Sequence, residues 1–201
     1  MAKEVRYRMN FKTIEIEDLN INPITMIGQD WWLVTAGNEI KGYNTMTASW
    51  GHLGAIWGKE RKKHKNLLSL PTAVVYVRPQ RYTKQFLDTE TIFTLSVFDR
   101  AYRDALVTLG SYSGRDGDKV SKAGLTPVFD GNTTYFKEAK MVFICRKIYQ
   151  APLLEEGFVD ASILKFNYDR DDLHEMYIGE ILKVLVCEEQ TNECNIKSVE
   201  L

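Results

Sequence analysis

The sequence predicts a mainly β protein, a mostly antiparallel β-barrel or sheet with a few attached helices. Runs rich in apolar, β-branched and aromatic residues, which favour strands, outnumber the helical patterns. These runs do not alternate regularly with helices, as they would in a parallel sheet built from βαβ units. The chain has 201 residues, of which 44% are hydrophobic and 26% charged, so we expect residues 1–201 to form one soluble domain with a sizeable core.

Six segments are predicted as strands. A turn is expected at Gly37-Asn38, because these residues tolerate the backbone angles of tight turns. Gly179, inside the last segment, is expected to mark a bulge or a close approach by another group. In chain order the predicted strands are Trp31–Thr35, Tyr43–Trp50, Ala73–Val77, Ile92–Phe98, Ala139–Tyr149 and Met176–Cys187.

Three helices are predicted between these strands. The first runs from Tyr82 to about Asp88. The second places its apolar residues at i, i+3, i+4 and i+7, starting from Tyr102, and Gly110 is its expected C-cap. A short third helix covers Asp116–Ala123 and is ended by Gly124.

Composition argues against several classes of function. The net charge of −1 gives no general attraction to nucleic acid or to a membrane surface. No apolar stretch is long enough to span a bilayer, and residues 1–20 contain no apolar signal-peptide core, so we expect a cytoplasmic protein. The three cysteines are too few for a disulfide framework, and no histidine lies near Cys187 and Cys194 to complete a zinc site, so no metal is expected.

The segment Arg78–Thr83 is the strongest candidate for ligand binding. It follows the apolar run Ala73–Val77 and precedes a predicted helix, so it delivers two arginines to a helix N-terminus. Amide groups there favour anions, and arginine binds phosphate oxygens with a planar pair of donors. A phosphorylated ligand is therefore predicted.

Three further segments have either a functional or a structural interpretation. Asn44–Gly51 alternates small hydroxyl residues, which suits an edge that meets a flat polar heterocycle or simply a strand with one polar face. Gly110–Lys119 is glycine-rich and carries Arg115 and Lys119, so it is a cationic ligand loop or a plain connector. His174 is placed to donate to a ligand near neutral pH or to serve as a hydrogen-bonded structural residue.

No sequence pattern marks a catalytic residue. The glycine-rich segment is neither GxGxxG nor GxxxxGK[ST], which argues against Rossmann and P-loop sites. No Ser-His-Asp or Cys-His arrangement can be argued, so any chemistry is expected to be supplied by a cofactor.

Taken together, four blocks resemble the flavin reductase family, in its flavoredoxin-like branch. Their order and spacing match over about residues 20 to 186, the expected core of the domain. The blocks are Tyr43–Gly51, Tyr76–Thr83, Gly110–Lys119 and His174–Glu180.

The resemblance implies a split β-barrel that binds FMN, as a homodimer with its sites near the subunit interface. By position, Thr45–Trp50 would lie along the isoalloxazine ring and offer backbone amides, with Trp50 limiting one ring face and His174 near the ring. Arg78 and residues 81–83 would approach the ribityl phosphate, and the third block would add contacts at the phosphate end. The predicted cofactor-binding residues are Asn44, Thr45, Met46, Thr47, Ala48, Ser49, Trp50, Arg78, Arg81, Tyr82, Thr83, Ser111, Lys119 and His174.

Three functions fit these features. The first is an FMN-binding oxidoreductase that passes electrons from NADH, NADPH or a redox protein through the flavin. The second is a flavin-carrying electron-transfer module without its own nicotinamide site. The third is a β-barrel binding module that has lost the flavin.

One departure from the family pattern affects specificity. Residues 60–70 separate Trp57-Gly58-Lys59 from Pro71, where relatives pass straight into the strand. This insertion begins with the basic run Glu60–Lys65, which is a solvated loop or a docking patch for an anionic partner or cofactor tail. Residues 188–201 are polar and aperiodic, and we expect a C-terminal tail there.

Overall fold

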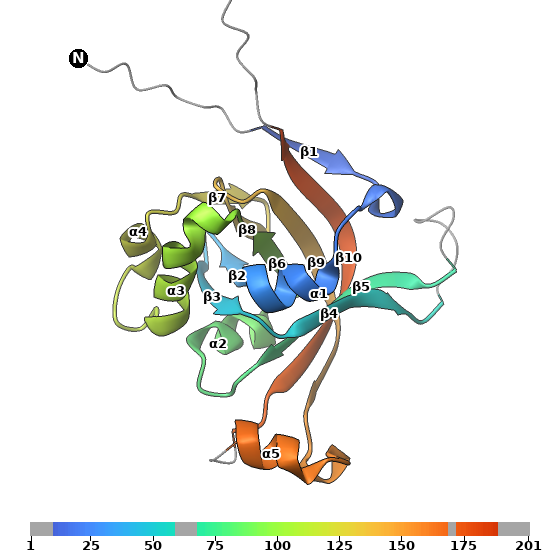
Figure 1. Ribbon diagram of the computed structural model, residues 1–201. Helices are drawn as coiled ribbons and strands as arrows, with labels where there is room; N and C mark the ends of the chain where they lie inside the picture. The colour runs from blue at the N-terminus through green and yellow to red at the C-terminus, as the bar shows by residue number, and fades with distance from the viewer. Residues whose placement is uncertain (1–9, 59–67, 169–171, 189–201) are drawn as a thin grey trace, which may run out of the picture.

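The computed structural model describes residues 10–58, 68–168 and 172–188. The basic run and residues 189–201 of the C-terminal tail lie outside these ranges. The described chain is built on an antiparallel sheet in the order β3-β2-β6-β9-β10-β5-β4, with β1 paired to β10, which confirms the mainly β prediction (Figure 1). Its strands are β1 (Asn10–Ile14), β2 (Trp32–Asn38), β3 (Gly42–Ala48), β4 (Gly51–Ile56), β5 (Leu70–Val77), β6 (Ile92–Val97), β9 (Met141–Pro152) and β10 (Glu175–Glu188).

The predicted helices are present, with two wrong boundaries. The third helix begins at Lys119 rather than Asp116, because the Asp118 side chain caps its first turn. The second predicted helix does not stop at Gly110 but continues to Ser111, and its C-cap is Tyr112. The third ends as predicted at Gly124, whose φ of 71° is left-handed. The helices are α1 (Pro23–Thr25), α2 (Tyr82–Thr89), α3 (Arg103–Ser111), α4 (Lys119–Ala123) and α5 (Ala161–Asn167), with single turns η1 (Ile16–Asp18), η2 (Met26–Asp30), η3 (Arg100–Tyr102) and η4 (Glu155–Gly157).

The turn after β2 lies later than the sequence indicates. Gly37 and Asn38 still pair with β3, opposite Tyr43 and Gly42. The side-chain oxygen of Asn38 accepts hydrogen bonds from the backbone amides of Ile40 and Lys41, each with a donor–acceptor distance of 3.0 Å. These two bonds stabilise the turn. The turn was therefore predicted two residues too early. Asn38 is the last residue of β2, and only its side chain takes part in the turn that follows.

Strand β2 is buried on both faces. Trp32, Val34 and Ala36 belong to one hydrophobic cluster, whereas Leu33 belongs to a second cluster that it shares with α3. This follows from the alternation of side chains along a strand. A second, two-stranded sheet, β7 (Pro127–Asp130) with β8 (Thr133–Phe136), contributes the buried Phe136 to the cluster near α3.

Gly179 lies at an irregularity in the pairing of β10 with β9, as its sequence position indicated. A methyl group on this residue would lie 2.6 Å from Cζ of Phe93 and 2.8 Å from Cβ of Cys145. Only glycine therefore allows the two strands and the Phe93 ring to pack this closely.

The two ends of the sheet meet at an opening that we call the seam. β3 and β4 stand at opposite ends of the strand order, and no ladder joins them among the described residues. The chain itself crosses the seam, since only Ser49 and Trp50 lie between the two strands. The sheet is therefore curled but not closed by hydrogen bonds (Figure 1).

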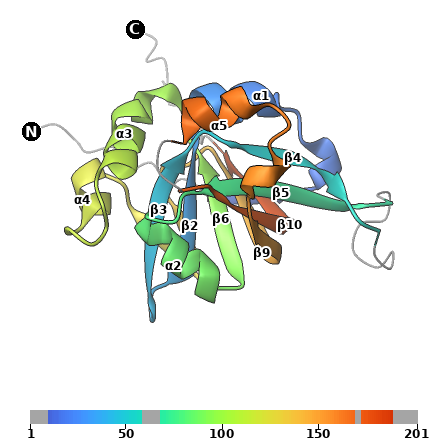
Figure 2. The same cartoon turned by 90° about the horizontal axis from the view of Figure 1, so that it is seen from below.

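Between β9 and β10 the chain leaves the sheet, and we call the described residues there, 153–168 and 172–173, the excursion. It carries η4 and α5, and the amide of Leu153 donates to the carbonyl of His174 over 2.9 Å at its base. Seen from below in Figure 2, α5 and α1 overlap, but Figure 1 shows α5 well away from α1, at the lower end of β9 and β10. No helix in the described part of the chain is long and apolar enough to cross a membrane.

Candidate functional site

A pocket of about 220 Å³ lies at the seam, and we call it the seam pocket. It gathers residues from three of the four sequence blocks: from β3 and the link after it, from the end of β5 and the turn into α2, and from the residue before β10. Eight of the predicted site residues line it together with Tyr76, which sequence reasoning missed. The lining residues are Met46, Thr47, Ala48, Ser49, Trp50, Tyr76, Arg78, Arg81 and His174.

Strand β3 offers its backbone rather than its hydroxyl groups to this pocket. Thr45 is fully buried, and its Oγ1 lies 2.8 Å from Oγ1 of Thr35. Thr47 donates from Oγ1 to the carbonyl of Leu106 over 2.5 Å. Since β3 is an edge strand, its backbone groups that face away from β2 are not committed to a ladder.

Asn44 and Thr83 connect the first block to the second. Nδ2 of Asn44 donates to Oγ1 of Thr83 over 2.7 Å, and both residues are buried. A methyl group on Gly114 would lie 2.2 Å from Oδ1 of Asn44 and 3.2 Å from the Tyr82 ring. The glycine-rich loop therefore packs directly against β3 and the first turn of α2. A side chain at position 114 would prevent this packing.

The first turn of α2 has the features of an anion site. Its N-cap is Arg81, and no side chain caps it, so the first amides face outward. Nη1 of Arg81 donates to the carbonyl of Gly110 over 2.8 Å, and the guanidinium of Arg115 lies 4.6 Å from the centre of the Tyr82 ring. Two cations from different blocks therefore lie beside the same helix start.

Lys119 lies near this group of cations but points at a helix end. Nζ of Lys119 donates to the carbonyls of Leu109 and Tyr112, over 3.0 and 3.1 Å, at the end of α3. Burial, and next the positive charge of Arg81, lower the pKa of Lys119 to about 8. Ser111, the last residue of α3, is exposed and does not line the seam pocket.

Arg78 lines the seam pocket while paired to the excursion. Nη1 of Arg78 lies 2.5 Å from Oδ2 of Asp172, and Nη2 donates to the carbonyl of Asn167 over 2.9 Å. Hydrogen bonds from Arg78 and next from Gln80 hold the pKa of Asp172 below its ordinary value. No sequence pattern marked Asp172 as the partner of Arg78, since the two residues are far apart in the chain.

His174 lies between the excursion and the seam. Its Nδ1 lies 2.8 Å from the hydroxyl of Tyr168, and its ring stacks on Trp50 with centroids 4.8 Å apart and planes inclined by 37°. Burial, and next the charge of Arg78, lower the pKa of His174 to about 4. The imidazole is therefore neutral at pH 7, which suits a hydrogen-bond donor or acceptor rather than a fixed positive charge.

A larger pocket of about 800 Å³ adjoins the seam pocket, and we call it the apolar pocket. Ser49, Trp50 and Tyr76 line both pockets, so the Trp50 side chain stands at their boundary. Its walls come from α1, η2, β4, β5 and the excursion. The lining residues are Pro23, Ile24, Ile27, Gly28, Ser49, Trp50, Gly51, His52, Leu53, Tyr76, Leu153, Phe158, Ile163 and Tyr168.

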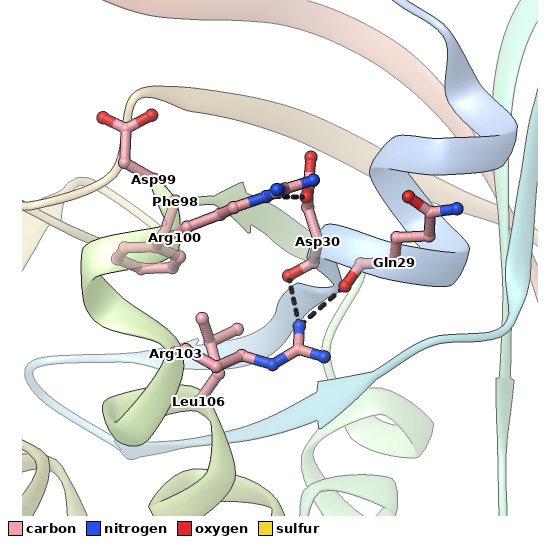
Figure 3. Close-up of a pocket in the computed structure, with 7 residues that line it drawn as sticks. All are labelled: Gln29, Asp30, Phe98, Asp99, Arg100, Arg103 and Leu106. Atoms are coloured by element: carbon pink, nitrogen blue, oxygen red, sulfur yellow. Dashed lines mark hydrogen bonds and ion pairs between the residues drawn. The ribbon is translucent and has the colours of Figure 1, made fainter.

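A third pocket, of about 270 Å³, lies apart from these two, between η2 and the start of α3 (Figure 3). Nη1 of Arg103 donates to the carbonyl of Gln29 over 2.7 Å, and its guanidinium lies 3.2 Å from the centre of the Trp31 ring. Arg100 pairs with Asp30 at 3.5 Å. These contacts attach η2 to α3, so the charged groups of this pocket have a structural role.

No protein-family model and no curated protein matches the chain. Solved structures do. An FMN-binding domain of a flavin reductase-like enzyme from Shewanella baltica is 15% identical, with a TM-score of 0.57 over 89% of this chain and 78% of that one. Flavoredoxin from Desulfovibrio vulgaris is 25% identical, with a TM-score of 0.54 over 78% and 68%. An NADH:FAD oxidoreductase from Streptomyces globisporus is 15% identical, with a TM-score of 0.53 over 79% and 77%.

These structures confirm the resemblance found in the sequence at the level of the fold. The protein has the FMN-binding split-barrel fold of flavin reductase-like domains and flavoredoxins.

Proposed function

We propose that the protein binds FMN at the seam and acts as a flavin-dependent oxidoreductase of the flavin reductase-like or flavoredoxin-like kind. One observation carries this proposal: sequence blocks that lie far apart in the chain converge on the seam pocket and on the start of α2. The solved structures of the same fold described as FMN-binding or as flavoredoxins support it.

The residues at the seam suit a flat, polar ring. The edge of β3 has backbone groups that no strand pairing uses, and the Ser49-Trp50 link follows it directly. The exposed Trp50 offers an aromatic face, and His174 offers a neutral ring nitrogen. The seam pocket alone is smaller than the roughly 300–1,000 Å³ of typical ligand pockets, so a flavin ring would also use space beside Trp50.

The other end of the site suits a phosphate. The uncapped first turn of α2, Arg81 and Arg115 lie together there, and Lys119 is close enough to Arg81 to respond to its charge. Helix amides and arginine donors are the groups that bind phosphate oxygens in proteins. Arg78 is a less direct candidate, because Asp172 already neutralises it.

FMN, when bound, would supply the two-electron chemistry, since the protein's own residues include no convincing acid–base pair. The chain's contribution would be to position the ring with β3 backbone groups and Trp50, to hold the phosphate at α2, and to place the neutral imidazole of His174 at the ring edge. Positive charge from Arg81 and Arg115 would favour the anionic end of the cofactor. We further propose that the electron donor is either a nicotinamide nucleotide or a redox protein.

A second candidate is a flavin-carrying electron-transfer module without a nicotinamide site. The similarity to flavoredoxin supports an electron-transfer module. The similarity to an NADH:FAD oxidoreductase supports a reductase to the same degree. A homodimer and a cytoplasmic location are further parts of the proposal. Large apolar side chains exposed on α1 and the excursion, such as Ile24, Val159 and Phe166, support an interface. The buried Cys145, which forms no disulfide, suits a reducing compartment.

The test begins with cofactor binding. We expect the purified protein to show flavin absorbance, or to gain it and a higher melting temperature when FMN is added. A colourless protein whose melting temperature ignores FMN would contradict the proposal. Anaerobic bleaching of the bound flavin by NADH or NADPH would then identify a reductase, whereas bleaching by reduced ferredoxin alone would identify an electron-transfer module.

A further inference from the structure

The C-terminal end of α2 is tied to the sheet by a cluster of polar residues that we call the α2 anchor. The cluster combines lysines, carboxylates, an amide and a phenol, which come from α2, β9 and β10. None of these residues lines the seam pocket or the apolar pocket, so none is expected to touch a ligand at the seam. The members of the α2 anchor are Lys84, Asp88, Lys147, Gln150, Glu175 and Tyr177.

The carboxylate of Asp88, in the last turn of α2, is the centre of this anchor. Its Oδ1 accepts hydrogen bonds from the hydroxyl of Tyr177 over 2.6 Å and from Nε2 of Gln150 over 3.0 Å. Tyr177 and Gln150 lie opposite each other on β10 and β9, so their side chains share one face of the sheet. Nζ of Lys84, one turn earlier on α2, donates to Oδ2 over 2.9 Å. Burial raises the pKa of Asp88, but these hydrogen bonds outweigh burial and hold that pKa below its ordinary value, so the carboxylate is charged at pH 7.

Two lysines extend the anchor to the backbone of α2 and to β10. Nζ of Lys147, on β9, donates to the carbonyls of Leu87 and Asp88, the latter over 2.9 Å. The last carbonyls of a helix have no partner within it, and the helix dipole favours a cation at that end. Nζ of Lys84 also lies 3.4 Å from the carboxylate of Glu175, the first residue of β10. The last turn of α2 is therefore fixed to β9 and β10 through both side chains and backbone.

The first turn of α2 is held by a different part of the sheet. Thr83 is bonded to Asn44 on β3, which stands at one end of the strand order, whereas β9 and β10 lie in its middle. Attachment at two separate points fixes both the place and the direction of a helix. Asp88 follows the N-cap Arg81 by seven positions, which is about 10 Å along the helix axis. The direction of the outward-facing amides of the first turn therefore depends on the α2 anchor.

Only one end of the proposed ligand is sensitive to this direction. A phosphate bound by the first turn of α2 depends on it, because a hydrogen bond weakens steeply as its donor turns away from the acceptor. A ring placed against β3 and Trp50 does not. We propose that the α2 anchor positions the phosphate end of the site, and that Tyr177 and Lys147 act on the phosphate through α2 without touching the ligand. This inference rests on the proposed function, in which the ligand is FMN.

Tyr177→Phe tests the proposal without changing any charge. The ring remains, with the ammonium groups of Lys84 and Lys147 at 6.0 and 5.9 Å from its centre, and Asp88 keeps Gln150 and Lys84 as partners. We expect FMN binding to weaken about threefold to tenfold, because the donors at the first turn are displaced, and riboflavin binding to stay within about twofold. Fluorescence titration of both flavins measures this. A lower melting temperature with an unchanged ratio of the two affinities would show that the hydroxyl only stabilises the fold, and would overturn the proposal.

The matched control is Tyr135→Phe. Tyr135 is a buried tyrosine on β8 that packs against Phe11 in the cluster near α3. Its substitution removes the same hydroxyl group from another part of the core and should leave the affinity for both flavins unchanged. If Tyr135→Phe reduces the preference for FMN as much as Tyr177→Phe does, the effect is a general one and the proposal fails.

Lys147→Met separates position from charge. Methionine keeps an unbranched apolar side chain but removes the ammonium group from the carbonyls of Leu87 and Asp88. We expect the same pattern as for Tyr177→Phe, with weaker FMN binding and unchanged riboflavin binding. A loss of FMN affinity in Lys147→Met but not in Tyr177→Phe would show that Lys147 acts by its charge at a distance, and would overturn the positioning role.

A flavin-free probe distinguishes the failure of this inference from the failure of the proposed function. Isothermal titration with inorganic pyrophosphate reports on the anion site at α2 alone. A protein that binds no flavin, but binds pyrophosphate more weakly in Tyr177→Phe than in Tyr135→Phe, would lose the proposed function and keep the positioning role. A protein that binds FMN with one FMN-to-riboflavin ratio in every variant would keep the proposed function and lose the inference. A protein that binds neither flavin nor pyrophosphate would lose both.

Discussion

The guanidinium of Arg78 lies 2.5 Å from the carboxylate of Asp172, so the second sequence block is tied to the excursion that precedes the fourth. The same carboxylate oxygen accepts a hydrogen bond from Nε2 of Gln80 over 3.0 Å. Arg78 and Gln80, both in the predicted phosphate segment, are therefore bound to Asp172. The positive charge that Arg78 can offer a ligand depends on this carboxylate.

Asp172→Asn tests whether Arg78 is held back from the ligand by this pair. Without the negative charge of Asp172, the Arg78 guanidinium should interact more strongly with the phosphate of FMN. FMN binding should then tighten about threefold to tenfold, which is part of the contribution of one charge-assisted hydrogen bond. Riboflavin, which lacks the phosphate, should bind unchanged. Fluorescence titration of both ligands measures this. Weaker binding of both would instead show that the pair only holds the excursion in place.

Arg81→Ala should weaken FMN binding by about 1.5–3 kcal/mol, the usual contribution of a hydrogen bond to a charged group. Riboflavin binding should change much less. Arg100→Ala is the matched control, because Arg100 is an exposed arginine in the pocket between η2 and α3. A loss that is equal for FMN and riboflavin would mean that Arg81 acts through its bond to the carbonyl of Gly110 rather than through the phosphate.

Lys119 gives the site a pH dependence. Its pKa is lowered to about 8 in the folded protein, so it is charged below that pH and increasingly neutral above it. A nearby phosphate favours the charged ammonium, so binding above pH 8 requires the uptake of a proton. The preference for FMN over riboflavin should therefore be full at pH 7 and decline as the pH rises past about 8.

Titrations of both flavins between pH 7 and 9.5 check this expectation. In Lys119→Met the preference should be smaller and should not change with pH around 8. A wild-type preference that is constant over this range would place Lys119 out of reach of the phosphate.

Gly179→Ala should destabilise the fold by about 1–3 kcal/mol, the usual cost of overpacking a core. The new methyl group would collide with Phe93 and Cys145, which are both buried. Gly54→Ala is the matched control, because Gly54 also lies in a strand but has nothing within 4 Å of the added group. Urea unfolding measures both free energies. A loss of less than about 0.5 kcal/mol at Gly179, the range of ordinary surface substitutions, would show that the sheet adjusts.

The strands that sequence reasoning found are those with strong local signals. Leu70–Val77 and Ile92–Val97 are rich in β-branched residues and buried, so propensity and burial agree. β4 was not predicted as a separate strand, because Gly51–Ile56 contains two glycines, is largely exposed, and shows no apolar alternation. α5 was missed although Asp160 caps its first turn, because the helix has only seven residues and buries none of them.

The candidate site divides in the same way. The position of Arg81 at the start of a helix was predictable, because a strand, an arginine and a helix start follow one another directly in the sequence. The commitment of Arg78 to Asp172 was not, since it is a tertiary contact. Nor was the apolar pocket, whose walls come from residues as far apart as Pro23 and Tyr168 and appear only when the chain is folded.

The Ser49-Trp50 link sets how the opening at the seam can move. The three residue steps from Ala48 to Gly51 span at most about 11 Å, so β3 and β4 cannot separate further at the point where the link joins them. At this point the two strands are joined by the covalent chain itself and not by hydrogen bonds between strands. The Trp50 side chain, which lines both the seam pocket and the apolar pocket, is therefore held at the boundary between them by the chain itself.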